Sequence, residues 1–175
     1  MAQVRNPLPN LKRLQELFDY ENGELYWRQK PSKYANNVVG KKAGMMAAYG
    51  YWRIKVDGYT HFAHRLIYAL HNNGVCPDFI DHIDGDHLNN KIENLREATA
   101  IQNAQNSKLH VANKSGAKNV SWFPSKNCWR VLLSINKKRK CWLVKDFELA
   151  ELIAIKARDK FHGKYANHGL TMQGV

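Results

Sequence analysis

One polar segment near the middle of the chain limits what this sequence can fold into. It reads Asp81-His82-Ile83-Asp84-Gly85-Asp86, followed by Asn89-Asn90, Glu93-Asn94-Leu95 and Gln102-Asn103. Apolar residues over 79–83 and 95–98 predict two short strands, with residues 84–94 as a polar loop between them. Thr99-Ala-Ile-Gln102 is a capping box that opens a helix to about residue 108. We therefore expect a strand, a loop, a second strand and a helix in this order.

The residue types in this segment suit the hydrolysis of a phosphodiester. That reaction needs a base to deprotonate water and an oxygen-ligated cation to stabilise the charge that develops. His82 suits the base because its unperturbed pKa lies near neutrality, and Asp81 and Asn103 suit a hard cation because both offer oxygen. Asn94 could hold the loop or the ring of His82. Neighbouring residues on a strand point to opposite faces. We therefore expect one of Asp81 and His82 to hold the metal ion and the other to face the attacking water.

The charge of the chain points to a polyanion as its partner. Lys and Arg number 27 and Asp and Glu 15, a net charge of +12. By region, residues 1–75 carry +6, residues 76–110 carry −3 and residues 111–175 carry +9. The basic flanks suit a phosphate backbone, and the acidic centre would repel that backbone unless a cation lay between them. The pattern favours a metal-dependent site on a nucleic-acid-binding protein over a basic protein with no such partner.

Composition excludes several other classes of protein. The 175 residues suit one domain or two small ones, and a hydrophobic fraction of 44% excludes a disordered polymer. No apolar stretch is long enough to span a membrane, and the N-terminal residues lack the apolar core of a secretory signal. Cys76, Cys128 and Cys141 form no CxxC pair, which argues against structural zinc and a disulfide framework. We expect a soluble cytoplasmic protein.

The rest of the chain reads as short elements on either side of the polar segment. Residues 9–19 predict a helix and residues 24–27 a strand, whereas residues 28–48 read as loop. Asp57-Gly58 predicts a hairpin turn between strands at 49–56 and 60–63, and a helix is expected over 64–72. Beyond residue 117, strands at 118–123, 128–136 and 139–144 precede a helix over 147–161. The predicted fold class is α+β, ending in a small three-stranded antiparallel sheet packed by one helix.

From His64-Arg65-Leu66 through Asn106 the sequence resembles the HNH endonuclease family, whose core is a ββα-metal fold. His82 is the lead histidine, Asn94-Leu95 carries the middle asparagine, and Asn103 stands where many members have a third histidine. Asparagine at that position resembles the H-N-N variant of phage homing endonucleases. The resemblance implies His82 as general base, Asp81 and Asn103 as ligands of one Mg²⁺ or Mn²⁺ ion, and Asn94 as an orienting residue.

Residues 115–168 resemble the ethylene-response-factor (apetala-type) DNA-binding domain. Ser115-Gly116, Val120-Ser121-Trp122, Trp129-Arg130-Val131 and Asp146-Phe147 carry this similarity. In that family the sheet enters the major groove of DNA. Alternation along the middle strand predicts that Trp129, Val131, Leu133 and Ile135 pack on the helix. The residues expected to face DNA are Arg130, Ser134 and Asn136, with Arg139 or Lys140 from the next strand, and Arg53 and Lys55 of the first hairpin.

These expectations define a working hypothesis. Residues 1–108 form a nuclease domain with a core over about 49–108, residues 109–117 a linker, and residues 118–175 a DNA-binding domain. The protein is expected to be a metal-dependent DNA endonuclease of the HNH homing type. We expect it to nick double-stranded DNA as a monomer. We expect neither a small-molecule cofactor nor a membrane as its partner. A catalytically inactive, sequence-specific DNA-binding regulator and an RNA-processing nuclease remain as alternatives.

Overall fold

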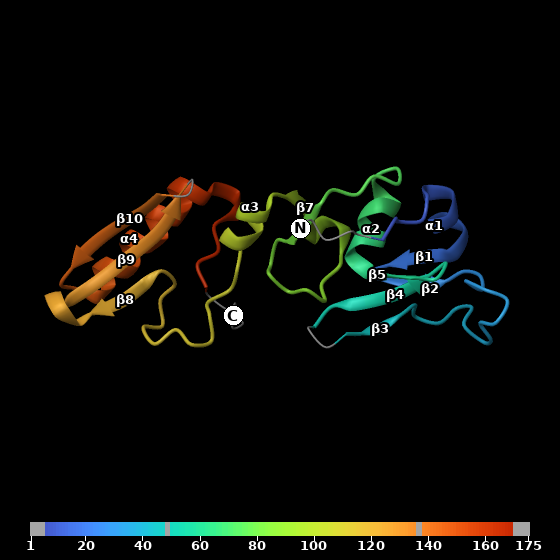
Figure 1. Ribbon diagram of the computed structural model, residues 1–175, viewed down its shortest axis with the longest axis horizontal. Coiled ribbons are helices and arrows are strands. Elements are labelled where there is room, and N and C mark those ends of the chain that lie inside the picture. Colours follow the sequence, from blue (N-terminus) through green and yellow to red (C-terminus); the bar gives the residue numbers. More distant parts are fainter. Residues whose placement is uncertain (1–5, 48–49, 136–137, 170–175) are drawn as a thin grey trace. The chain divides into compact units, whose positions relative to one another are not determined.

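The computed structural model describes residues 6–47, 50–135 and 138–169, and the chain divides into two compact units at Met1–Thr99 and Ala100–Val175 (Figure 1). Each unit has a hydrophobic core of its own. Helices alternate with small antiparallel sheets, so the chain has an α+β fold as predicted. None of the helices in the described ranges has the length and apolar character needed to cross a membrane.

The first unit begins with a helix that runs directly into a hairpin. Helix α1 (Leu11–Leu17) is capped by Asn10, whose Oδ1 accepts from the backbone N–H of Arg13 at 2.8 Å. Strands β1 (Phe18–Glu21) and β2 (Glu24–Trp27) then pair antiparallel. The sequence pattern does not predict β1, because Phe18 continues the apolar stripe of α1. Leu14 and Leu17 are fully buried, which fixes the helix on the core.

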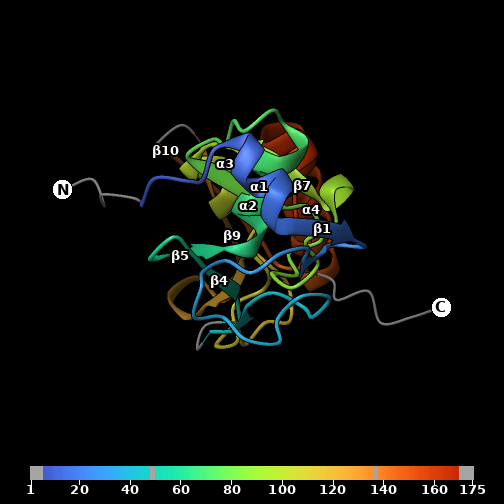
Figure 2. The same cartoon turned by 90° about the vertical axis from the view of Figure 1, so that its right-hand side faces the viewer.

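A three-stranded sheet follows, with the order β3 (Met45–Met46), β4 (Trp52–Val56) and β5 (Tyr59–Phe62). The predicted turn at Asp57-Gly58 is confirmed, and both residues have the positive φ that such a hairpin favours, 48° and 87°. Helix α2 (Ala63–His71) starts directly after β5 and packs beside α1 (Figure 2). Leu66 and Ile67 of α2 are fully buried.

The polar segment of the sequence lies on the last hairpin of this unit. Strand β6 (Phe79–His82) pairs antiparallel with β7 (Leu95–Ala98), so that Asp81 lies opposite Arg96 and His82 opposite Leu95. The short 3-10 helix η1 (Ile92–Asn94) leads into β7. Ile80 and Leu95 belong to the same buried core as α1 and α2, so the functional segment is anchored by its apolar neighbours.

The second unit contains a sheet covered by one long helix. Its elements are α3 (Ala100–Gln105), β8 (Val120–Phe123), η2 (Pro124–Lys126), β9 (Cys128–Ile135), β10 (Lys138–Val144), α4 (Phe147–His162) and η3 (Gly163–Tyr165). The three strands are antiparallel in the order β10-β9-β8, and α4 packs on them. Val120, Val131, Ala150 and Ala154 form the core between sheet and helix. The predicted three-stranded sheet with its helix is confirmed.

Helix α3 is shorter than the sequence predicts. It ends at Gln105 rather than near residue 108, and the Lys118 ammonium donates to the backbone carbonyls of Gln105 and Ser107, which have no partner within the helix. Arg158, which is 1% exposed, donates in turn to the carbonyl oxygen of Lys118 at 2.5 Å. The end of the segment predicted as a linker, residues 109–117, is tied to the second unit, because Ala117 is buried in its core and Ser115 Oγ donates to the carbonyl oxygen of Val120 at 2.7 Å.

Candidate active site

Strand β6 ends in two adjacent functional side chains, Asp81 and His82, which are only 3% and 4% exposed. The cross-strand register brings Arg96 to Asp81, and its Nε and Nη2 lie 2.8 and 2.6 Å from Oδ2. Burial of a carboxylate is costly unless a charge and hydrogen bonds compensate it. Arg96 provides both, and it holds the Asp81 carboxylate in one orientation.

The His82 ring belongs to a cluster of aromatic and imidazole rings, here called the histidine cluster, formed by Tyr51, Phe62, His64, His82 and His87. The ring of His64 lies edge-on to that of His82, with centroids 5.1 Å apart. The ring of His87 lies 5.6 Å from His82 and stacks on Tyr51 at 4.3 Å. The ring contacts of His82 come from Tyr51, which directly precedes β4, from His64 of α2 and from His87 in the loop after β6.

Burial within the histidine cluster disfavours the charged forms of His64 and Tyr51. Burial, followed by the neighbouring His82, lowers the pKa of His64 to about 3, so its imidazole is neutral at neutral pH. Burial also raises the pKa of Tyr51, and the negative charge of Asp81 adds to this effect. The site therefore combines the Asp81 carboxylate, paired with Arg96, with a buried His64 ring that is neutral at neutral pH.

The loop after His82 is closed by the side chain of Asn94. Asn94 Nδ2 donates to Asp84 Oδ1 at 2.9 Å and to the carbonyl oxygen of Asn89 at 2.8 Å. Burial favours the neutral form of Asp84, but hydrogen bonds from the Asp86 backbone N–H, Asn89 and Asn94 outweigh it and lower the Asp84 pKa. Asp84 is thus an ionised centre that organises this loop.

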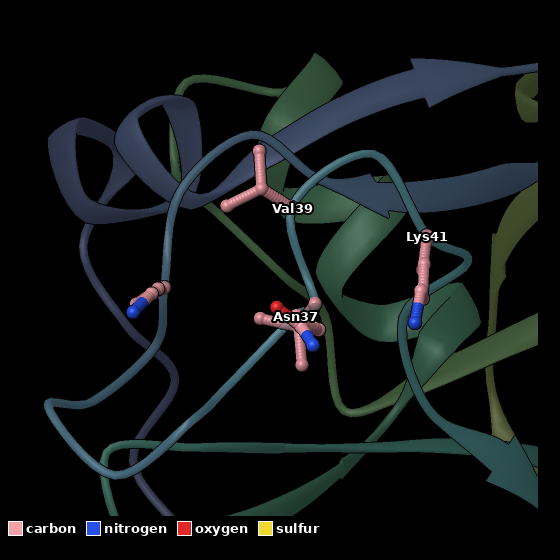
Figure 3. A pocket seen from close by; sticks show the side chains of 5 residues that line it. Asn37, Val39 and Lys41 are labelled. Atoms are coloured by element: carbon pink, nitrogen blue, oxygen red, sulfur yellow. The ribbon is translucent and has the colours of Figure 1, made fainter.

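The basic segment between β2 and β3 lies apart from this cluster in the sequence and lines a pocket of its own (Figure 3). The pocket has a volume of about 550 Å³, and its lining consists of Lys30, Asn37, Val38, Val39 and Lys41. It shares no residue with the histidine cluster. Its lysines belong to the basic flank that the sequence assigns to a phosphate backbone.

Comparison with known proteins identifies the family. The family model for HNH endonucleases matches residues 61–105, which hold the whole histidine cluster apart from Tyr51. Protein 3.8 of Escherichia phage T7 is 36% identical over 98 residues, 54% of this chain and 79% of that protein. Residues 61–105 of the chain are therefore an HNH endonuclease domain. Such a domain implies nuclease activity and binding to DNA.

A second viral relative agrees with this assignment. An uncharacterized HNH endonuclease of Acanthamoeba polyphaga mimivirus is 45% identical over 60 residues, which cover 33% of this chain and 32% of that protein. The match thus spans about a third of the mimivirus protein. No solved structure matches the chain.

Three of the four predicted active-site residues lie on the β6–β7 hairpin of the first unit. Asp81 and His82 end β6, and Asn94 ends η1 and reaches the loop between them. Asn103 lies on α3 in the second unit, where it is exposed. In the described parts of the chain, no three His, Cys, Asp or Glu side chains are grouped as metal ligands.

Asp81 nevertheless fits a hard divalent cation by the chemistry of its donor. Its carboxylate is a buried oxygen donor held by Arg96. Mg²⁺ is commonly bound through one or two carboxylates, with water and substrate phosphates filling its other positions. HNH nucleases are in general dependent on a divalent metal ion, and this donor set agrees with that property.

The predicted DNA-contacting residues occupy different environments. Arg53 is half-buried with its guanidinium 4.8 Å from the centroid of the Phe62 ring, whereas Lys55 is exposed. Arg130 is half-buried over Phe123, 5.0 Å from the ring centroid, and Ser134 is exposed. Asn136 lies outside the described residues.

Arg139 and Lys140, the two residues of β10 predicted to contact DNA, lie on opposite faces of the sheet. Arg139 lies opposite Ser134, and therefore on the same face of the sheet as Arg130. Lys140 lies opposite Leu133, which is 1% exposed, and its ammonium sits 4.4 Å from the centroid of the Phe161 ring of α4. Arg139 thus shares the face away from the helix, and Lys140 the face toward it.

Sequence reasoning missed Arg96 and Asn90 as parts of the site. Arg96 follows from the pairing of β6 with β7, which the sequence does not specify to the residue. Asn90 lies in the predicted polar loop, where no sequence pattern marks it as a partner of His82, but it is 4% exposed and its Oδ1 lies 2.9 Å from His82 Nε2. His64 is buried, and its edge-on contact with the His82 ring adds it to the site.

Proposed function

We propose that this HNH endonuclease is a metal-dependent enzyme that hydrolyses one phosphodiester of double-stranded DNA, leaving a nick. His82 acts as the general base, and Asp81 would hold a Mg²⁺ or Mn²⁺ ion. The observation that carries the proposal is the adjacent pair Asp81 and His82, both buried and each with a different partner. Separate partners allow one side chain to hold a cation while the other accepts a proton.

The proposal assigns each step to a particular group of this chain. His82 removes a proton from the attacking water, and its ring is oriented by Asn90 and by the edge of His64. Arg96 pairs with the buried Asp81 carboxylate and orients it. The bound divalent ion would stabilise the negative charge that develops on the phosphate oxygens. Asn94 maintains the loop beside His82.

In this proposal the C-terminal sheet recognises the DNA site that is cut. The face away from α4 carries Arg130, Ser134 and Arg139, a mixture of cations and a hydroxyl suited to phosphates and to guanine edges. Arg53 and Lys55 in the first unit add to the cationic surface. The resemblance to the apetala-type domain and the confirmed sheet and helix support this assignment. With one active site per chain, we propose a monomer that cuts one strand.

Incubation with supercoiled plasmid tests the proposal directly. Wild type in Mg²⁺ or Mn²⁺ should convert it to open circles, and EDTA should prevent this. His82→Ala should lose cleavage but still bind DNA. His110→Ala is the matched control, because His110 is exposed and its ring bonds only to its own turn at Ala112. Linear product would indicate cleavage of both strands rather than a nick.

Binding assays separate the alternatives. Tight binding to duplex DNA without strand scission in either metal would favour the DNA-binding regulator. Structured RNA that competes with duplex DNA at equal concentration would favour the RNA-processing nuclease. Cleavage that persists at the wild-type rate in His82→Ala would remove His82 from the mechanism.

A further inference from the structure

The segment between β2 and β3 concentrates positive charge. Residues 28–44 hold five basic side chains and no acidic one. Of the five, Arg28 forms an ion pair with Asp19. A second, Lys42, forms one with Glu24. In the described ranges of the chain, the remaining three have no ion pair with a carboxylate: Lys30, Lys33 and Lys41. The segment therefore carries positive charge that an external anion can neutralise.

Two of these three lysines line the pocket in the same segment (Figure 3). No carboxylate is among the described residues that line it: Lys30, Asn37, Val38, Val39 and Lys41. The two ammonium groups can only donate hydrogen bonds, and the Asn37 amide adds further N–H donors. The volume of about 550 Å³ falls within the range of ligand-binding pockets. The lining thus favours an anion over a cation.

The backbone that carries Lys41 is fixed to the strands of the first unit. The N–H of Gly40 donates to the carbonyl oxygen of Trp27 at 2.7 Å, and the N–H of Trp27 donates to that of Lys41 at 3.0 Å. The N–H of Lys41 donates to the carbonyl oxygen of Val38 at 2.9 Å, which closes a turn. A Cβ at Gly44 would collide with a backbone oxygen of β4, so the segment also packs tightly on that strand. The pocket is therefore formed before a ligand binds, and binding requires little ordering of the loop.

The anion that the rest of the first unit points to is a phosphate of DNA. The pocket lies in the same compact unit as the histidine cluster, and the HNH endonuclease domain at residues 61–105 implies binding to DNA. Strand β4, on which the segment packs, carries Arg53 and Lys55, which are already proposed to contact DNA. A duplex carries one negative charge per about 1.7 Å of its axis, so separate sites on one protein can each hold a phosphate.

We propose that this pocket holds one backbone phosphate of duplex DNA through Lys30 and Lys41, outside the histidine cluster. The contact is independent of base sequence, because a phosphate contact carries no sequence information. It belongs to the first unit, whereas the proposed recognition of the DNA site belongs to the C-terminal sheet. The inference rests on the proposed function, since it takes duplex DNA as the substrate.

Fluorescence anisotropy of the full chain on a labelled duplex in EDTA measures this contact without cleavage. The double variant Lys30→Gln/Lys41→Gln should lower the slope of log affinity against log salt concentration by about 0.9, the value for one phosphate. At 0.1 M salt this corresponds to a roughly eight-fold lower affinity, on two duplexes of unrelated sequence alike. Lys12→Gln/Lys33→Gln is the matched control, because it removes the same charge from exposed lysines of the same unit that do not line the pocket. An equal loss in the control would overturn the inference.

A second pair of variants tests the cavity rather than the charge. Val39→Phe narrows the pocket and leaves every charge in place, and Val39 is exposed, so the fold should tolerate the larger ring. It should lower the salt slope as the double lysine variant does. Val75→Phe, at an exposed valine of the same unit that does not line the pocket, should bind as wild type. Wild-type binding by Val39→Phe would overturn the inference, because the lysines would then act without the pocket.

Plasmid cleavage separates a failure of this inference from a failure of the proposed function. Wild type that nicks plasmid, with pocket variants that bind duplex like their controls, would overturn the inference and leave the proposed function intact. Wild type that binds duplex through the pocket but cleaves nothing would overturn the proposed function and leave the pocket assigned to DNA. A loss of affinity confined to structured RNA would assign the pocket to RNA and overturn the inference.

Discussion

Asn94 and Asp84 are joined by two hydrogen bonds that run in opposite directions. The backbone N–H of Asp84 donates to Asn94 Oδ1 at 3.1 Å, and Asn94 Nδ2 donates to Asp84 Oδ1 at 2.9 Å. The backbone N–H of Ile83 also donates to the Asn94 carbonyl oxygen at 2.9 Å. Ile83 and Asp84, which directly follow His82, are therefore both fixed by Asn94, eleven and ten positions further along the chain.

Asn94→Ala removes this closure and should loosen the loop beside His82. We expect a loss of about 1–3 kcal/mol in the free energy of unfolding, because buried polar groups lose their partners. Asn94→Asp keeps the shape but places a second carboxylate against Asp84, and should be at least as destabilising. Urea unfolding of both variants measures the effect. A wild-type midpoint for Asn94→Asp would contradict the assigned donor.

Arg96→Met should be among the most destabilising substitutions in the first unit. It leaves the Asp81 carboxylate, only 3% exposed, without its cation. Breaking a buried ion pair from one side costs about 3–5 kcal/mol. Asp81→Asn in the same chain should recover much of this loss, because the uncompensated charge is gone. Denaturant unfolding of the two single variants and the double variant gives the coupling, and additive losses would argue against a buried pair.

The sequence predicts the strands and turns of this chain better than the partners of its side chains. The turn at Asp57-Gly58, the strands on both sides of the polar loop and the three strands of the second unit follow from local patterns. The pairing of Asp81 with Arg96 does not, because it depends on a register between segments separated by a loop. A shift of that register by one residue would place Arg96 on the other face.

Local sequence patterns likewise do not predict where α3 ends or on which face of the sheet Lys140 lies. The capping box at Thr99 marks where α3 begins, but its end depends on Lys118, which lies thirteen residues beyond Gln105. The sequence leaves Arg139 and Lys140 of β10 as alternatives for the contact with DNA, and the two lie on opposite faces because side chains alternate along a strand. Contacts between distant segments decide both features.

The buried His64 should make the protein less stable in acid. Its folded-state pKa of about 3 lies below the ordinary value of 6.5, so the unfolded chain binds the proton more readily. The free energy of unfolding should fall as the pH drops from 6.5 toward 3, by up to about 1.4 kcal/mol per pH unit. His64→Phe should remove this dependence. Urea unfolding at several pH values measures it, with His110→Phe as the exposed control.

Gly23→Ala tests how closely the turn between β1 and β2 packs against the backbone of Asn90 and Lys91. The new Cβ would meet backbone atoms at 2.7 and 2.9 Å, and φ at this position is +89°. Gly58 has a similar φ of +87°, but a Cβ there meets nothing within 4 Å. Both alanine variants therefore carry the cost of a positive φ, about 1 kcal/mol or more, whereas Gly23→Ala alone must displace Asn90 and Lys91. Gly23→Ala should lose more stability than Gly58→Ala, and equal losses would show that the hairpin does not fix this segment.

The two faces of the C-terminal sheet predict unequal effects of neutralising neighbouring cations. Arg139→Gln removes a charge from the face that carries Arg130 and Ser134, and should weaken binding to duplex DNA at every sequence. The slope of log affinity against log salt concentration should fall by about 0.9 for each DNA phosphate that the variant no longer neutralises. Lys140→Gln should change that slope less, because its ammonium lies against Phe161 of α4, and should instead cost roughly 0.5–1 kcal/mol of stability. Fluorescence anisotropy at several salt concentrations measures the slopes, and a larger change for Lys140→Gln would assign DNA binding to the helix side of the sheet.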